Sequence, residues 1–161
     1  WRAMSKQSDG PVFGRVINTS STSGIYGNVG QTNYGAAKAG IASLTIIAAR
    51  ELKRFGVTVN AVSPTAYTRM TDYLREYTEE DKEVRDPRWV SPTVVYLASE
   101  DAGDITGRVI QAGAGRVAVC EGWRRGAEVD QMDDVVALGL EIRRMAGEVR
   151  KNSGMDGLEL D

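Results

Sequence analysis

A tyrosine and a lysine four residues apart are the side chains of this sequence best suited to moving a proton. Tyr34 and Lys38 open a segment with the composition of a helix, and side chains at this spacing share one helix face. An adjacent ammonium and the positive end of a helix both favour the ionised phenolate. Tyr34 can therefore give a proton to a carbonyl or take one from an alcohol. The same spacing also arises by chance, as a surface cation over a ring.

Ser21 lies thirteen residues before Tyr34 and gives the pair a context. Residues 14–20 form a β-branched run that ends in small polar residues, which predicts a buried strand with a site at its carboxyl end. Residues 20–31, rich in Ser and Gly, predict a loop that brings this strand end and the helix start to one crevice. The Ser21 hydroxyl can hydrogen-bond a substrate oxygen there. The alternative is that the serines of this loop only cap it.

The elements that must position these side chains predict a parallel α/β sheet. A helix is expected over residues 34–55, with Thr32 or Asn33 as its N-cap and Gly56 directly after its end. A second buried strand should follow and stop at Ser63-Pro64. Strand, long helix and strand make a βαβ unit with parallel pairing and a right-handed crossover. This second strand is residues 57–62. The further expected elements are a helix that starts at Ser91-Pro92, the strands 106–112 and 117–120, and a turn at 113–116 between these strands.

Other stretches lie outside this unit. The polar residues 65–87 predict a short helix and a mobile loop, either as a lid over the site or as a solvated surface excursion. Residues 132–150 predict an amphipathic helix, and residues 152–161 a disordered tail. Residues 1–4 have the pattern of the middle of a helix, which is not typical of a natural amino terminus. The expected buried stripe of the amphipathic helix is Val135, Val136, Leu140, Ile142 and Met145.

The composition narrows the classes of partner. The 161 residues, 42% hydrophobic and 26% charged, fit one compact globular domain. A net charge of -2 provides no basic field for nucleic acid or an anionic membrane, and no apolar stretch is long enough to cross a bilayer, so a small molecule is the expected partner. With no His and only Cys120, no metal site is expected. We expect a cytoplasmic protein whose cysteine is a small buried residue beside a strand.

Three motifs, in their order and spacing, resemble the short-chain dehydrogenase/reductase family. They are residues 18–21 (Asn-Thr-Ser-Ser), 30–40 (around Tyr34 and Lys38) and 56–64 (ending in Ser-Pro), and the resemblance covers about residues 14–112. It implies a Rossmann-type doubly wound parallel sheet and an NAD or NADP cofactor. Residues 65–71 and 113–124 look like bacterial relatives of the dehydrogenase part of peroxisomal multifunctional enzymes, which act on 3-hydroxyacyl-CoA thioesters and hydroxysteroids.

The resemblance also implies roles for single residues. Tyr34 would be the acid/base, Lys38 would bind the nicotinamide ribose and favour the phenolate, and Ser21 would orient the carbonyl. Pro64 and Thr65 would border the nicotinamide, with Thr68 near its carboxamide. Thr65 stands where the family has Gly, and the segment from there to the next Thr is one residue shorter.

The family's first strand and Gly-rich pyrophosphate turn, and an Asn of its catalytic group, are not among these residues. The glycines at 24, 27 and 30 lack the spacing of that turn. We therefore expect residues 1–126 to be the catalytic half of the domain, with about three strands, and residues 127–161 to be a carboxyl-terminal helix and tail. The expected function is an NAD(P)-dependent oxidoreductase that forms a homo-oligomer. The alternative is a truncated, inactive fragment that acts at most as an oligomerisation or binding module.

Overall fold

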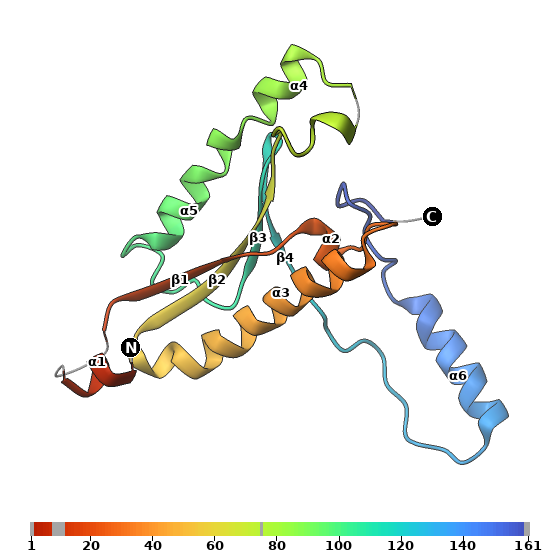
Figure 1. Ribbon diagram of the computed structural model, residues 1–161. Coiled ribbons are helices and arrows are strands. Elements are labelled where there is room, and N and C mark those ends of the chain that lie inside the picture. Colours follow the sequence, from red (N-terminus) through yellow and green to blue (C-terminus); the bar gives the residue numbers. More distant parts are fainter. Residues whose placement is uncertain (1, 8–11, 75, 160–161) are drawn as a thin grey trace. The chain divides into compact units, whose positions relative to one another are not determined.

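The computed structural model describes residues 2–7, 12–74 and 76–159 (Figure 1). Contacts divide the chain into two units, Trp1–Glu121 and Gly122–Asp161, which are described separately. The first unit holds all four strands and the residues expected to do chemistry. Among the described residues, no helix is long and apolar enough to span a membrane.

One mostly parallel sheet organises the first unit. Its strands, in the order β1-β2-β3-β4, are β1 (Gly14–Thr19), β2 (Val57–Thr65), β3 (Val109–Gly113) and β4 (Arg116–Cys120). β2 pairs in parallel with both β1 and β3, and β4 returns antiparallel to β3 as a hairpin. The predicted α/β class and parallel βαβ unit are confirmed, and the hairpin supplies a fourth strand.

The long helix α3 (Thr32–Leu52) connects β1 to β2 and is followed by the 3-10 turn η1 (Lys53–Phe55). Gly56 adopts the left-handed conformation after it, with φ 76°, as its predicted position requires. The predicted N-cap was wrong, because Gln31 occupies that position and makes no side-chain capping bond. Its Oε1 instead accepts hydrogen bonds from Ser23 Oγ (2.7 Å) and Asn28 Nδ2 (3.0 Å).

Two apolar clusters hold helices on opposite sides of β1 and β2 (Figure 1). On one side, Ala49 of α3 packs against Val57 and Val59 of β2. On the other side, Leu97 of α5 (Ser91–Ala98) packs against Val62 and its neighbours on β3. Full burial of one such side chain contributes about 1.5–3 kcal/mol. The sheet is therefore a firm base for the side chains at its carboxyl edge.

Strand β2 continues through Pro64, although the sequence predicted a stop there. Pro64 stays in register with Ala112 of β3. The backbone of Val62, two residues earlier, faces β1 and accepts a hydrogen bond of 2.9 Å from the N–H of Ser20. Pro64 therefore faces the same side, where β1 has already ended, and its missing N–H leaves no strand bond unmade.

The segment after β2 is short helices joined by turns. It contains the 3-10 turn η2 (Asp72–Leu74), the helix α4 (Glu79–Val84) and the 3-10 turn η3 (Pro87–Trp89). α4 begins with a capping box in which Thr78 and Asp81 satisfy each other's backbone N–H groups. This reciprocal cap lets a helix of only six residues form in a polar stretch.

In the second unit, the predicted amphipathic helix is α6 (Val135–Glu148). In the tail, Gly154 donates a hydrogen bond of 2.7 Å to the carbonyl of Leu158, and Ser153 forms a bridge with Glu159. At the other end of the chain, the predicted helix is α1 (Arg2–Gln7).

Candidate active site

Ser21 lies just after β1, and it is the N-cap of a short helix, α2 (Thr22–Ile25), where the sequence predicted only loop. Its Oγ accepts a hydrogen bond of 3.2 Å from the backbone N–H of Ser23. Such a cap uses an acceptor lone pair and leaves the hydroxyl proton free for a second partner. The capping alternative and the substrate-binding role are therefore compatible in one residue.

Two glycines bring α2 into close contact with α3. A Cβ added to Gly24 would lie 2.6 Å from the backbone N of Ala39 and 2.6 Å from the backbone C of Lys38. A Cβ added to Gly35 would lie 3.0 Å from the backbone O of Ser23. Any larger side chain at position 24 would force the two helices apart. The helix that Ser21 caps thus packs directly on the helix that carries Tyr34 and Lys38.

Tyr34 and Lys38 lie one turn apart in the first half of α3. The ammonium Nζ of Lys38 is 5.7 Å from the centroid of the Tyr34 ring. It also donates a hydrogen bond of 3.0 Å to the backbone carbonyl of Thr19, at the end of β1. The Tyr34 side chain is 44% exposed, so its phenol is accessible to a ligand.

Buried polar side chains fix α3 on the sheet beneath these residues. Ser20 donates a hydrogen bond of 2.9 Å to the backbone carbonyl of Lys38, and Asn18 Nδ2 donates one of 2.9 Å to Thr45 Oγ1. Ser63, on β2, is fully buried, and no described group hydrogen-bonds to its Oγ. The register aligns Thr19 with Val62, so the next residues along, Ser20 and Ser63, are neighbours on adjacent strands.

The residues expected to border a nicotinamide lie along and just beyond the end of β2. Pro64 is exposed and Thr65 is partly exposed. Thr68 belongs to a separate turn, in which its Oγ1 accepts a hydrogen bond of 3.2 Å from the N–H of Met70. Its N–H donates one of 2.8 Å to Thr71 Oγ1. The structure thus brings the elements of Ser21, Tyr34 and Lys38 together and holds Thr68 in contacts of its own.

No pattern in the sequence predicted a contact between Tyr26 and Cys120. The Tyr26 hydroxyl lies 3.5 Å from Sγ of Cys120, and either group can donate the hydrogen bond. Burial raises the pKa of Tyr26 to about 12, and the hydrogen bond to the thiol adds to this effect. Cys120 is partly exposed at the end of β4 rather than fully buried as predicted.

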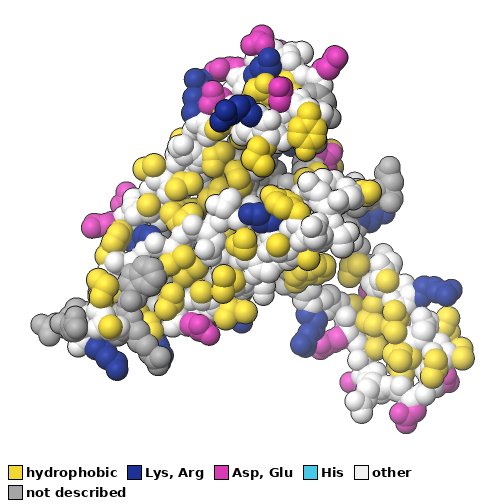
Figure 2. Space-filling model, in the orientation of Figure 1, with side chains coloured by type: hydrophobic (Ala, Val, Ile, Leu, Met, Phe, Trp, Pro, Cys, Tyr) yellow, Lys and Arg dark blue, Asp and Glu magenta, His cyan; other side chains and the backbone are white. Residues whose placement is uncertain are grey.

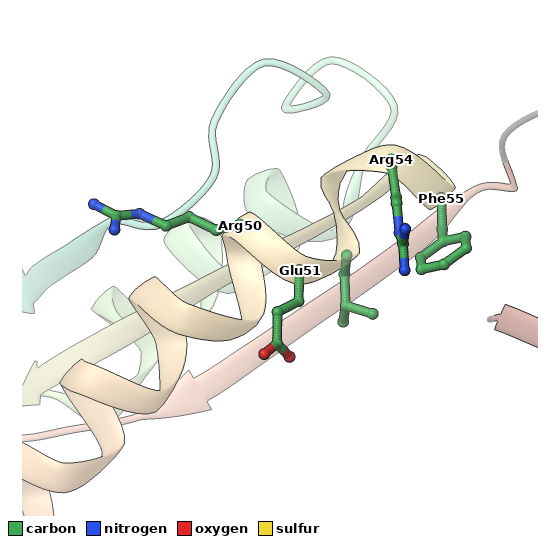
Figure 3. A pocket seen from close by; sticks show the side chains of 5 residues that line it. Arg50, Glu51, Arg54 and Phe55 are labelled. Carbon is green, nitrogen blue, oxygen red and sulfur yellow. The ribbon is translucent and has the colours of Figure 1, made fainter.

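Cavities in the described part of the first unit include the following two. One, of about 570 Å³, is lined by residues 50–52, Arg54 and Phe55 (Figure 3). At a rise of about 1.5 Å per residue, it is more than ~20 Å along the helix from Tyr34, and it lies at the wrong end of α3 for this chemistry. The other, of about 390 Å³, lies between α4, η3 and the β3–β4 hairpin. Its lining is mainly apolar, with Val84, Trp89 and Val117 as the larger side chains.

The chain matches one family model over most of the first unit. That model is described as enoyl-(acyl carrier protein) reductase, and it matches residues 2–116. A hydroxyacyl-CoA dehydrogenase of Mycobacterium tuberculosis is 45% identical over 114 residues, which are 68% of this chain and 36% of that protein.

Solved structures of dehydrogenases are also similar to this chain. A short chain dehydrogenase from Mycobacterium avium superposes with a TM-score of 0.79 at 45% identity, over 94% of this chain and 51% of that one. The peroxisomal multifunctional enzyme type 2 from Drosophila melanogaster gives a TM-score of 0.68 at 31% identity, over 89% and 25%. The chain thus spans between a quarter and about half of the length of these proteins.

Proposed function

Since the chain belongs to the short-chain dehydrogenase/reductase family, we propose that it supplies the proton-transfer residues of an NAD(P)-dependent oxidoreductase. The observation that carries this proposal is the close packing of α2 on α3. It joins the helix capped by Ser21 to the helix of Tyr34 and Lys38, whose ammonium lies 5.7 Å from the tyrosine ring. The reaction interconverts a carbonyl and a secondary alcohol.

Tyr34 is the acid and base of the proposed reaction. Its accessible phenol donates a proton to the carbonyl oxygen in reduction and accepts one from the hydroxyl in oxidation. The Lys38 ammonium places a positive charge 5.7 Å from the centroid of the Tyr34 ring. Ser21 donates its free hydroxyl proton to the same substrate oxygen and so orients the carbonyl toward Tyr34.

The residues present fit a nicotinamide dinucleotide, NAD or NADP. The ammonium of Lys38 has three N–H donors, and one of them donates a hydrogen bond to the backbone carbonyl of Thr19. No other described residue has a hydrogen bond to this ammonium. The remaining donors suit the vicinal hydroxyls of a ribose. Pro64 and Thr65, at the carboxyl end of β2, would border the ring, and Thr68 would lie near its carboxamide. When bound, the nicotinamide supplies or accepts the hydride.

For the substrate we propose a 3-hydroxyacyl-CoA thioester or its 3-oxo counterpart, with a hydroxysteroid as the next class. The similarity to the hydroxyacyl-CoA dehydrogenase of Mycobacterium tuberculosis supports this choice. The apolar cavity of about 390 Å³ beside α4 offers room for an acyl chain.

An absorbance assay tests this function. The full-length gene product is mixed with 3-hydroxybutyryl-CoA, and the formation of NADH or NADPH is followed. Turnover with one of the two cofactors is expected. A pure, folded gene product that oxidises neither a 3-hydroxyacyl-CoA nor a hydroxysteroid with either cofactor would contradict the proposal.

A second candidate function is assembly, with α3 as the interface of a homo-oligomer. Leu44 and Ile47 of this helix are 56% and 51% exposed, and hydrophobic side chains gather over α3 in Figure 2. Light scattering after size-exclusion chromatography tests this role. Leu44→Gln with Ile47→Gln should convert an oligomer to a monomer, whereas Val95→Gln on exposed α5 should not. A wild-type monomer would refute it.

We place the reaction in a reducing compartment, such as the cytoplasm. The single Cys120 has no second cysteine to form an internal disulfide. Fractionation of cells that express the tagged gene product would locate it directly, and recovery in an oxidising compartment would contradict this assignment.

A further inference from the structure

The contact between Tyr26 and Cys120 joins two segments that are 94 residues apart in sequence. Tyr26 is the C-cap of α2, and its N–H donates a hydrogen bond of 2.8 Å to the carbonyl of Thr22. Cys120 is the last residue of β4 and is in register with Val109 of β3. The side-chain contact therefore ties the end of a four-residue helix to the sheet.

This contact is one of a small set that holds α2. Gly24 packs against the backbone of α3, and Ser23 Oγ donates a hydrogen bond of 2.7 Å to Gln31. Both of these anchors tie α2 to α3 or to the turn before it. Among the described side chains, the Tyr26 hydroxyl makes the hydrogen bond that reaches the β3–β4 hairpin. It thus links the end of α2 to the last residue of β4.

The chemistry of the pair suits a permanent link. Burial raises the pKa of Tyr26 to about 12, so its hydroxyl keeps its proton throughout the neutral pH range. A neutral phenol both donates and accepts, and the thiol does each more weakly. The neutral phenol and the thiol can therefore hydrogen-bond to each other at neutral pH.

From this geometry we propose that Tyr26 is a positioning residue for Ser21, and that Cys120 is its anchor. Ser21 and Tyr26 lie at the two ends of the same single helical turn. A helix this short moves as one body, so a tilt at Tyr26 displaces the Ser21 hydroxyl from the substrate oxygen. A displacement of about 1 Å in a reacting group can lower a rate by as much as ~100-fold. This inference rests on the oxidoreductase function proposed above.

The first test measures the contact without any activity. Cys120 is the only cysteine of the 161-residue chain, so a thiol reagent reports on one position. Tyr26→Phe keeps the ring and removes the hydroxyl, and it should raise the labelling rate several-fold. Tyr96→Phe, on exposed α5, is the matched control and should leave the rate unchanged. Equal labelling in wild type and Tyr26→Phe would overturn the proposed link.

The second test measures positioning in the full-length gene product. Tyr26→Phe and Cys120→Ala should each lower kcat by about 10- to 100-fold, with the KM for the cofactor unchanged. Cys120→Ser retains a hydrogen-bonding group and should restore most of kcat. A purely structural role would lower the melting temperature without this selective loss and rescue.

The outcomes separate the two proposals. An active wild type whose kcat is unaffected by Tyr26→Phe, or not rescued by Cys120→Ser, would overturn the positioning role alone. A folded wild type with no oxidoreductase activity would contradict the proposed function, and the positioning role would fall with it.

Discussion

The ammonium of Lys38 donates a hydrogen bond of 3.0 Å to the backbone carbonyl of Thr19. This bond connects the helix α3 to the end of β1, directly before the segment that carries Ser21. In the reverse direction, Ser20 donates a hydrogen bond of 2.9 Å to the carbonyl of Lys38. Lys38 therefore joins the strand and the helix as well as placing a positive charge near Tyr34.

Replacement of this ammonium should remove activity and largely spare the fold. Lys38→Met removes the positive charge near Tyr34 and the donors proposed for the ribose. We expect a loss of about 10²–10⁴-fold in kcat/KM, the range of general acid-base catalysis. Lys53→Met, at an exposed lysine in η1 just after the far end of α3, is the control and should keep wild-type activity. Equal activity of Lys38→Met and wild type would contradict the role of Lys38.

The close contact at Gly24 should not tolerate even one methyl group. In Gly24→Ala the new Cβ would lie 2.6 Å from the backbone of α3, which forces a shift that costs about 1–3 kcal/mol. Gly40→Ala is the matched control, because its Cβ would meet open space in the middle of α3. That change should be neutral or stabilise by up to about 1 kcal/mol. Urea denaturation measures both, and a Gly24→Ala protein as stable as wild type would show that the helices are not in close contact.

Alanine substitution of two neighbouring buried serines should change the free energy of unfolding differently. Ser20→Ala removes a hydrogen bond of 2.9 Å, and we expect a loss of about 1 kcal/mol. Ser63→Ala removes a hydroxyl that has no described partner, so stability should stay constant or rise by up to about 1 kcal/mol. The difference in the free energy of unfolding between the two variants is the readout. A larger loss for Ser63→Ala would indicate that its hydroxyl has a partner in solution.

Tyr26 should make stability depend on pH in the alkaline range. Its pKa is about 12 in the folded chain, against 10.0 for a free tyrosine. The folded state therefore holds this proton more tightly, and the stabilisation is complete below pH ~10 and is lost as the pH rises toward 12. Chemical denaturation at a series of pH values should show a steeper decline for wild type than for Tyr26→Phe over this range. Parallel curves would show that the phenol is not perturbed.

Much of the fold follows from local patterns. The β-branched run at β1, the helix stop at Gly56 and the parallel βαβ unit depend on residue types close together in sequence. The shared face of Tyr34 and Lys38 could also be predicted from local sequence, because a helix of standard geometry places side chains four residues apart on one face.

Other features depend on what the chain meets in three dimensions. The close approach at Gly24 needs α3 beside α2, and Pro64 is tolerated in β2 because β1 has ended. The Tyr26 contact with Cys120 spans 94 residues, a separation that no periodic pattern reports.

The most direct test of the central claim is the turnover of Tyr34→Phe in the full-length gene product. This change keeps the ring beside Lys38 and removes only the hydroxyl that moves the proton. We predict that kcat falls by about 10²–10⁴-fold, while Tyr96→Phe keeps the wild-type rate. A Tyr34→Phe enzyme that turns over at the wild-type rate would contradict the assignment of Tyr34 as the acid and base.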